Sequence, residues 1–330
     1  MMNWKKWKTA LAAATLAVSV GLLAGCGGDK AQDSSKATYN IGVVQLVEHG
    51  ALDAANKGFV DGLASKGFKD NVKFDQQNAQ ADQSNLQNIA QRFMSNKVDL
   101  ICAIATPAAQ SVANVTKDIP IVATAVTDYE EAKLVESNAK PNTNVTGTTD
   151  MNPIKEQIDL MLKLVPNTKT IGTVYCSSEV NSQKQIDIMK AYAQSKGIKV
   201  VEATVSTVND IQQAAQSIVG DVDAIYVPTD NIIASAMPTL IAITDAAKVP
   251  VICGEANMVK AGGLATLGVD YYKLGFQTGE MAADILAGKA KPATMAIQSL
   301  KEMTLTINAE NAKKLGIEIP ADLKAQAGIK

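Results

Sequence analysis

The residue types that most often carry catalysis are sparse in this chain of 330 residues. His49 is the only histidine, so a nucleophile activated by a histidine base would have to use it, and no serine or cysteine lies in a recognisable nucleophile turn. The sequence also contains no phosphate-binding loop of the Walker or dinucleotide type and no calcium-loop spacing. We therefore expect no enzymatic activity, no cofactor and no metal site.

Polar side chains instead recur directly after short apolar runs, where helices are expected to begin. The first N–H groups of a helix are unpaired and carry the positive end of its dipole, so they can bind a carboxylate. Asp150, Asp230 and Glu255 are suited to an ammonium group, although Asp, Asn, Ser and Thr at such turns are also ordinary helix caps. The polar residues of these turns are Gln45, Glu48, His49, Asp53, Thr106, Thr127, Asp128, 146–150, Glu179, Asn181, Ser182, 229–231 and Glu255. Together they predict a site for an amino-acid zwitterion.

The elements that position these turns follow a β-α pattern. Continuously apolar runs are typical of strands buried on both faces of a parallel sheet. The segments between them have helical periodicity, as at 85–96, where Asp82 and Ser84 can cap the helix. The predicted strands are 39–44, 72–75, 100–105, 121–125, 170–176, 199–203, 224–227 and 249–253, with a last strand at 303–307.

The order of these units repeats, since 39–124 and 170–253 each hold four of them. The repeat predicts an α/β protein of two doubly wound, Rossmann-like lobes with ligands at the C-terminal ends of the strands. We place the hinge crossings near 145–150, near 254 and at 292–298. The N-terminal lobe would then comprise 39–148 plus 254–295, and the C-terminal lobe 149–253 plus 296–330.

The N-terminus has the order of an export signal. Lys5, Lys6 and Lys8 precede an uncharged apolar stretch at 9–21, and Leu-Ala-Gly stands directly before Cys26. This order predicts a signal peptide at 1–25, lipidation of Cys26 and a flexible linker at 26–38. The protein is then expected on the extracytoplasmic face of the cell membrane, in the periplasm where the host has two membranes.

Charge and cysteine content exclude two further classes of protein. Three of the 31 basic residues lie in the signal, which leaves 28 against 33 acidic residues, a net charge of −5, and only one arginine, Arg92. No basic patch for nucleic acid is expected. Cys102, Cys176 and Cys253 lie singly in apolar runs, which predicts buried free thiols rather than disulfides.

Several segments in the same order resemble the substrate-binding lipoproteins of ABC importers, specifically the tryptophan/tyrosine-binding branch. The segments that carry the resemblance are IGVVQLVEHGALDAANKGF (41–59), AIATPAAQSVAN (103–114), AVTDYEEAKLV (125–135), NVTGTTD (144–150), SSEVNSQ (177–183), VPTDN (227–231) and NAENAKKLGIEIP (308–320). The likeness covers nearly all of the chain after the signal. Two departures lie beside the expected pocket, because Gly50 and Tyr129 stand where the family often has proline.

The resemblance implies a periplasmic-binding-protein fold of type I with three hinge crossovers. It also implies a monomer that closes on an amino acid, most often aromatic, and delivers it to an ABC permease and ATPase. Thr148 and Asp150 would hold the amino-acid backbone at the hinge. The first-lobe wall would hold Gln45, His49, Leu52 and Asp53, its rim Thr106, Thr127 and Asp128, and the second lobe Asn181, Asp230, Asn231 and Glu255.

Two alternatives share this fold. The cargo could be another small solute, such as a branched-chain amino acid, a purine or a short peptide. The protein could also be a sensory receptor module that binds a solute without importing it.

Overall fold

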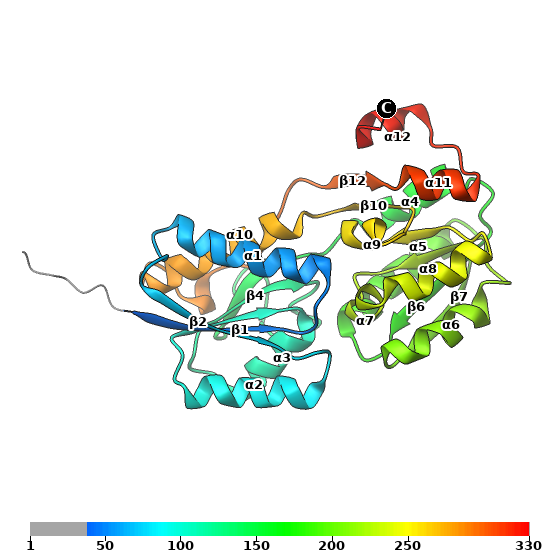
Figure 1. Cartoon of the computed structure of the whole chain (residues 1–330). Coiled ribbons are helices and arrows are strands. Elements are labelled where there is room, and N and C mark those ends of the chain that lie inside the picture. The colour runs from blue at the N-terminus through cyan, green and yellow to red at the C-terminus, as the bar shows by residue number, and fades with distance from the viewer. Residues whose placement is uncertain (1–37, 330) are drawn as a thin grey trace, which may run out of the picture. The chain divides into compact units, whose positions relative to one another are not determined.

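Two six-stranded sheets, each covered by helices, make up the part of the chain that the structure describes, residues 38–329 (Figure 1). The structure is a computed structural model, and these residues belong to one compact unit. The expected signal peptide 1–25, the lipidation site Cys26 and the linker 26–38, except Thr38, lie outside the described residues. Within that range no helix is long and apolar enough to cross a bilayer.

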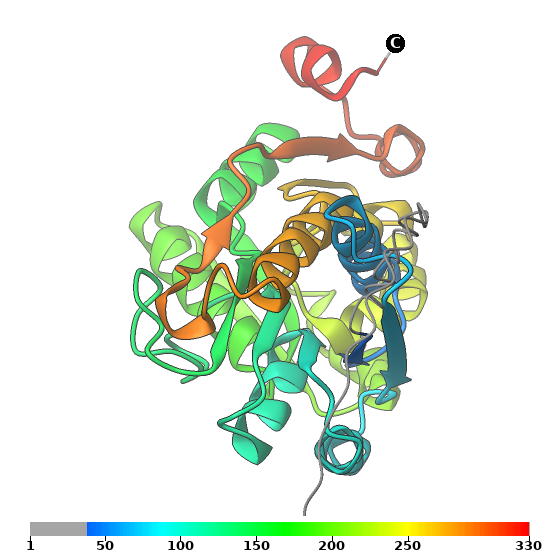
Figure 2. The same cartoon turned by 90° about the vertical axis from the view of Figure 1, so that its left-hand side faces the viewer.

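The first lobe is built on a sheet with strand order β11-β5-β4-β3-β1-β2, in which every pair of neighbours is parallel. Its elements are β1 (Tyr39–Gln45), α1 (Gly50–Ser65), β2 (Val72–Asn78), α2 (Gln83–Ser95), β3 (Leu100–Ile104), α3 (Thr106–Val115), β4 (Ile121–Val126), β5 (Val145–Thr149), α10 (Tyr271–Leu286), the 3₁₀ turn Pro292–Thr294 and β11 (Gln298–Ser299). Figure 2 shows α1 and α10 on one face of this sheet and α2 and α3 on the other.

The second lobe repeats this plan with strand order β12-β10-β9-β8-β6-β7. Its edge strand β12 is antiparallel to β10, whereas the other pairs are parallel. Its elements are α4 (Ile154–Leu164), β6 (Thr170–Cys176), α5 (Val180–Ser195), β7 (Lys199–Val205), the 3₁₀ turn Val208–Asp210, α6 (Ile211–Ile218), β8 (Ala224–Val227), α7 (Asn231–Ser235), α8 (Met237–Ala246), β9 (Val251–Cys253), α9 (Ala256–Lys260), β10 (Ala265–Gly268), β12 (Thr304–Ile307), α11 (Ala309–Leu315) and α12 (Ala321–Ala327).

The chain passes between the lobes three times: between β5 and α4, between β10 and α10, and between β11 and β12. The expected boundaries at 254 and 296 are wrong. Segment 254–268 belongs to the second lobe, because the β-α pattern continues through α9 into a fifth parallel strand, β10. Segment 296–299 belongs to the first lobe, because β11 pairs with β5. Neither strand shows a clear apolar run, because β10 reads Ala-Thr-Leu-Gly and β11 has only the two polar residues Gln-Ser.

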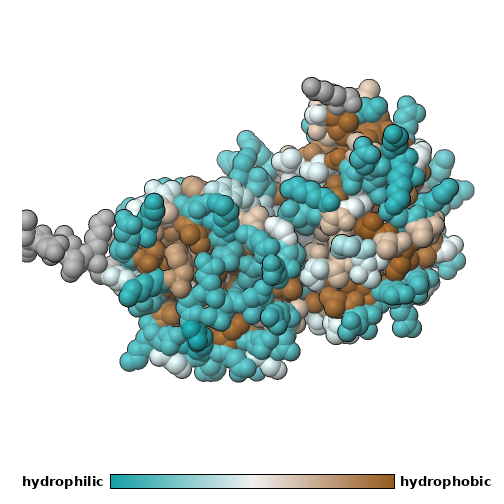
Figure 3. All heavy atoms as spheres, in the orientation of Figure 1, coloured by the Kyte–Doolittle hydropathy of each residue, from teal (hydrophilic) through white to brown (hydrophobic). Residues whose placement is uncertain are grey.

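Buried apolar side chains hold each lobe together around its own sheet. Cys102, Cys176 and Cys253 lie in β3, β6 and β9 as buried free thiols, as predicted. On the face of the first lobe visible in Figure 3, hydrophilic side chains predominate, with smaller apolar patches between them. The described lobes therefore keep most of their large apolar side chains inside.

Glycines allow α1 and α10 to pack with their backbones in close contact. A Cβ at Gly275 would lie 1.9 Å from the carbonyl oxygen of Ala55, and one at Gly58 would lie 2.1 Å from that of Tyr272. Since no side chain fits at these distances, the two helices form one rigid pair. Both helices begin at the same end of the first lobe. This places His49, before α1, and Tyr271, the first residue of α10, in the wall of the same cavity.

Candidate functional site

A small enclosed cavity lies where the C-terminal ends of strands from the two lobes face each other. Its volume is ≈ 10 Å³, about enough for one water molecule, so the lobes close tightly around it. Leu52, Ala125 and Met258 supply apolar wall. The polar residues that argue for a ligand are His49, Asp150, Asp230, Asn231, Glu255 and Tyr271. Among the described residues that line the cavity there are three carboxylates and no lysine or arginine, so the cavity favours a cationic group.

Asp150 stands at the first crossing between the lobes, directly after β5. Its side chain is 3 % exposed. Thr127 Oγ1 donates to its Oδ1 (2.9 Å) and Tyr271 Oη donates to its Oδ2 (2.6 Å). Burial raises the pKa of this carboxyl, and the two hydroxyl donors oppose that rise. A carboxylate held in place with only hydroxyl partners is suited to pair with an ammonium group.

Asp230 and Glu255 cap the two second-lobe helices that begin at the cavity. Asp230 accepts from Ile233 N (2.9 Å), Cys176 N (2.6 Å) and Ser182 Oγ (2.7 Å). Glu255 accepts from Met258 N (2.8 Å) and Asn257 N (2.6 Å). These carboxylates therefore have partners of their own, and burial raises the pKa of both. Because their oxygens already accept hydrogen bonds, Asp230 and Glu255 would act on a ligand through their negative charge rather than through a direct hydrogen bond.

Two first-lobe helices have no side-chain cap: α1, which begins at the cavity wall, and α3, which begins after β3 and contributes no residue to that wall. The N-cap positions are His49 for α1 and Ala105 for α3, and neither side chain accepts from its helix. Ala105 has a φ of 87°, a conformation that alanine rarely adopts. Beside it, Thr106 Oγ1 is buried and has no hydrogen-bond partner in the described part of the chain. Uncapped helix N-termini with a spare hydroxyl suit a carboxylate.

Hydrogen bonds already join the lobes across the cavity. His49 Nε2 lies 3.3 Å from Asn231 Oδ1, and Thr127 Oγ1 lies 3.5 Å from Thr229 Oγ1. At the rim, Lys184 Nζ lies 3.0 Å from Glu131 Oε2 and 3.6 Å from Asp128 Oδ2. These contacts are possible only when the lobes are together, so the structure represents a closed form.

Several residues predicted for the site lie outside the cavity wall. Gln45 and Asp53 bond each other (2.7 Å) in an open hollow beside Asn56. Thr148 is buried inside the first lobe, where its Oγ1 lies 3.1 Å from Thr124 Oγ1 and 2.8 Å from Thr278 Oγ1. Asp128 stands on the rim, Thr127 lies behind Asp150, and Thr106 and Asn181 are buried nearby.

Sequence reasoning missed five cavity residues: Tyr271, Ala125, Met258 and two alanines, Ala51 in α1 and Ala234 in α7. Tyr271 is the first residue of α10, directly after the N-cap Asp270. A prediction that the chain crosses between the lobes just before this helix would have placed Tyr271 at the site. Ala125 has a φ of 54° at the end of β4, which a sequence of apolar letters does not reveal. Met258 lies in the short helix α9, in the segment assigned to the wrong lobe.

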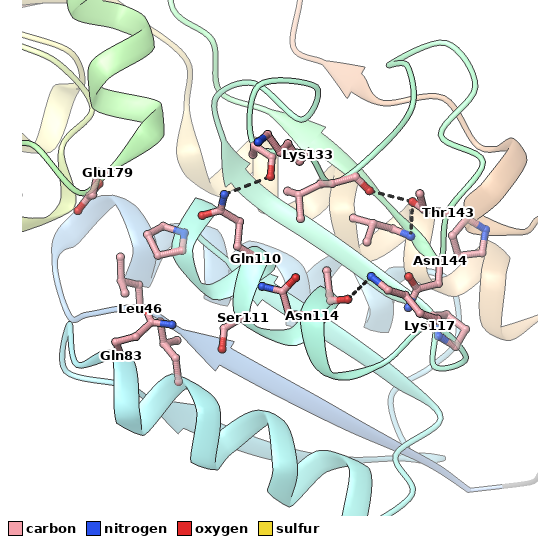
Figure 4. Close-up of a pocket in the computed structure, with 18 of the residues that line it drawn as sticks. Leu46, Gln83, Gln110, Ser111, Asn114, Lys117, Lys133, Thr143, Asn144 and Glu179 are labelled. Carbon is pink, nitrogen blue, oxygen red and sulfur yellow. Dashed lines mark hydrogen bonds between the residues drawn. The ribbon is translucent and has the colours of Figure 1, made fainter.

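A larger, open groove runs along the first lobe (Figure 4). It extends from Glu179, on the second lobe, past Leu46 and Gln83 to Lys117 and Asn144. Most of its lining comes from the first lobe alone, and its polar groups are spread along its length. The enclosed cavity is the better candidate, because both lobes build it at the ends of their strands.

Comparison with known proteins identifies relatives of the whole described chain. Residues 40–329 match the family model of the ABC transporter substrate binding protein. The chain is 44 % identical over 328 residues to a tyrosine-binding protein of Clostridioides difficile, covering 96 % of this chain and 94 % of that protein.

Two solved structures of similar identity match the described residues to different extents. An ABC domain from Streptococcus pneumonia in complex with L-Trp is 42 % identical with a TM-score of 0.86, covering 88 % of this chain and 99 % of that chain. The ligand-free, open structure of a substrate binding protein with adhesive properties from Clostridium difficile is 46 % identical with a TM-score of 0.67, covering 86 % and 97 %. At similar identity, the lobes described here match the L-Trp complex more closely.

Proposed function

The chain belongs to the ABC transporter substrate binding protein family, and we propose that it captures an aromatic amino acid between its lobes and delivers it to an ABC permease. One observation carries the choice of an amino acid. The hydroxyl-bonded carboxylate of Asp150 lines the enclosed cavity together with the N-terminus of α1, and α3 begins after β3, the strand between β1 and β4; neither helix has a side-chain cap. That pairing matches the opposite charges of a zwitterion.

In the proposed complex the first lobe holds the backbone of the amino acid. Its ammonium group pairs with Asp150, while Asp230 and Glu255 add negative charge from the second lobe. Its carboxylate lies against the N-termini of α1 and α3, with Thr106 Oγ1 as a further donor. No arginine is needed, because the helix amides and dipoles neutralise the carboxylate.

An aromatic side chain is supported by the relatives and by the apolar wall. One relative is named a tyrosine-binding protein, and another was solved with L-Trp. In this chain Leu52 and Met258 line the cavity, and a thioether packs well against an aromatic ring. An amino acid fits this cavity only when the lobes move apart, because a volume of ≈ 10 Å³ holds about one water molecule.

We propose that residues 1–25 direct export and that lipid on Cys26 holds the protein at the extracytoplasmic face of the membrane as a monomer. The tether keeps captured ligand near the permease. Closure is the signal for docking, because only the closed form brings both lobes into one fixed arrangement. The protein itself carries out no chemical step in this account.

Fluorescence offers a sensitive test. Trp4 and Trp7 are the only tryptophans of the chain, so protein that begins at Cys26 has none. Bound L-tryptophan would then emit alone when excited at a wavelength that tyrosine does not absorb. We expect a shifted, saturable emission with tryptophan and calorimetric binding of aromatic amino acids. Failure of tyrosine, tryptophan and phenylalanine to bind would contradict the proposed function.

A further inference from the structure

Two buried acceptor atoms on the second lobe have no hydrogen-bond partner within residues 38–329. They are Glu179 Oε1 and Asn181 Oδ1, on side chains that are each only 4 % exposed. A buried polar atom without a partner costs free energy, so native proteins rarely leave one unless a ligand or water completes it. Two such atoms on neighbouring side chains therefore need an explanation.

A chain of hydrogen bonds connects these atoms to the enclosed cavity. Asn181 Nδ2 donates to Glu179 Oε2 (2.9 Å), and so does Asn231 Nδ2 (2.7 Å). Asn231 lines the cavity and contacts His49 of the first lobe through its Oδ1 (3.3 Å). Glu179 stands where the open groove reaches the second lobe (Figure 4). The pair thus lies just beyond Asn231, on the side where the groove leads outward.

The hydrogen bonds also fix what the free atoms can do. Both Asn231 and Asn181 use their amide nitrogens toward Glu179, so the free Oδ1 of Asn181 is an acceptor. Glu179 Oε2 also accepts from Asn231 N (3.3 Å), which leaves Oε1 as its free oxygen. Burial and nearby Asp230 raise the pKa of Glu179 to about 8. Its Oε1 can therefore accept a hydrogen bond or, when protonated, donate one, as a phenol can.

We propose that Glu179 and Asn181 form a second polar pole of the site, which binds a hydrogen-bond donor on the ligand's side chain. The site then selects tyrosine, with its phenol, and tryptophan, with its indole N–H, over phenylalanine. This inference rests on the proposed function, since it requires an aromatic amino acid in the enclosed cavity.

The pole serves the side chain because the backbone of the ligand is bound elsewhere. The ammonium and carboxylate groups are attached to one carbon, so they must bind close together. Asp150 and the N-termini of α1 and α3 all belong to the first lobe or its crossing. Glu179 and Asn181 belong to the opposite lobe, at the start of α5. Asn231 lines the cavity and contacts Glu179, so we expect the side chain of the ligand to extend past Asn231 toward this pair.

Wild-type protein provides the first arm of the test. Calorimetry would compare tyrosine with phenylalanine, and tryptophan with 3-benzothienylalanine, in which sulfur replaces the N–H. We expect the ligand without the donor to bind at least about tenfold more weakly in each pair, because it leaves buried acceptors unpaired. Equal affinities within both pairs would overturn the inference and leave the proposed function standing, whereas no binding by any of the four would overturn both.

Variants provide the second arm. Asn181→Leu and Glu179→Gln keep the size of each side chain but remove or reverse one free acceptor. We expect them to lower the preference for tyrosine over phenylalanine at least about fivefold while phenylalanine itself changes little. Glu156→Gln, the same change at an exposed position of α4 in the same lobe, is the control. An equal loss for both ligands would overturn the inference.

Discussion

Replacing Asp150 with asparagine should weaken ligand binding strongly while leaving the fold intact. The carboxylate is buried and has only Thr127 and Tyr271 as donors (2.9 and 2.6 Å). Both are hydroxyls, which can rotate to satisfy an amide, so Asp150→Asn keeps the local packing. A bound ammonium would lose its paired charge, and truncating one member of a buried charge pair costs about 2–5 kcal/mol. That corresponds to an affinity roughly 30-fold to several-thousand-fold lower.

Although ligand affinity should fall in Asp150→Asn, the free energy of unfolding of the ligand-free protein should not. Burial raises the pKa of Asp150, so the folded chain binds its proton more tightly than the unfolded chain does. The stability from this carboxyl is therefore full below its unfolded pKa and is lost as the pH rises through the folded pKa. At neutral pH we expect Asp150→Asn to be as stable as wild type or more so.

Calorimetry and thermal unfolding would measure both effects, with Asp221→Asn on the exposed surface of the second lobe as a matched control. Wild-type affinity in Asp150→Asn would refute the assignment of the ammonium group to this carboxylate. Loss of both binding and stability would refute the argument that the two hydroxyls tolerate an amide.

Three further predictions follow from other contacts. Lys184→Met removes the ion pairs with Glu131 and Asp128 that join the two lobes at the rim. Because exposed ion pairs contribute about 0.2–1 kcal/mol, the ligand affinity measured at low salt should fall less than about fivefold. At high salt it should hardly change. Gly275→Ala places a Cβ 1.9 Å from Ala55 O and should lower the free energy of unfolding by about 1–3 kcal/mol or more, whereas Gly220→Ala, which meets nothing within 4 Å, should not. Burial and Asp230 raise the pKa of Glu179 from 4.5 to about 8, so urea unfolding of the ligand-free protein should show stability falling between about pH 5 and pH 8, and Glu179→Gln should flatten that fall.

Long apolar runs made most of the fold predictable. Six of the predicted strands stand out because buried parallel strands are apolar on both faces, whereas the edge strands β2 and β7 are partly exposed and less apolar. The repeated β-α order implied two lobes. The strands that were missed are short or polar. β5 reads Val-Thr-Gly-Thr-Thr and looks like a linker, and β10 and β11 have four and two residues. Their assignment depends on pairing with distant strands, which no local pattern records.

The candidate site was predictable in part. Polar residues that follow a strand lie near the cavity, but the direction of each side chain decides whether it lines the cavity. Asp150, Asp230, Asn231 and Glu255 do so, and His49 and Leu52 come with the start of α1. Gln45 shows the limit, since it ends β1 but turns toward Asp53 and Asn56. The family departure at Tyr129 also has a structural role, because its buried hydroxyl lies 2.8 Å from Ala123 O and 3.0 Å from Thr148 O and shares its one proton between them.

A crystal structure of the protein with tyrosine or tryptophan would decide where and how the ligand binds. We expect the amino acid to lie between the lobes, with its ammonium at Asp150, its carboxylate at the N-termini of α1 and α3, and its side chain directed toward Glu179. Ligand bound in the open groove along α3, or bound between the lobes with Asp150 facing no part of it, would show that the proposed binding mode is wrong.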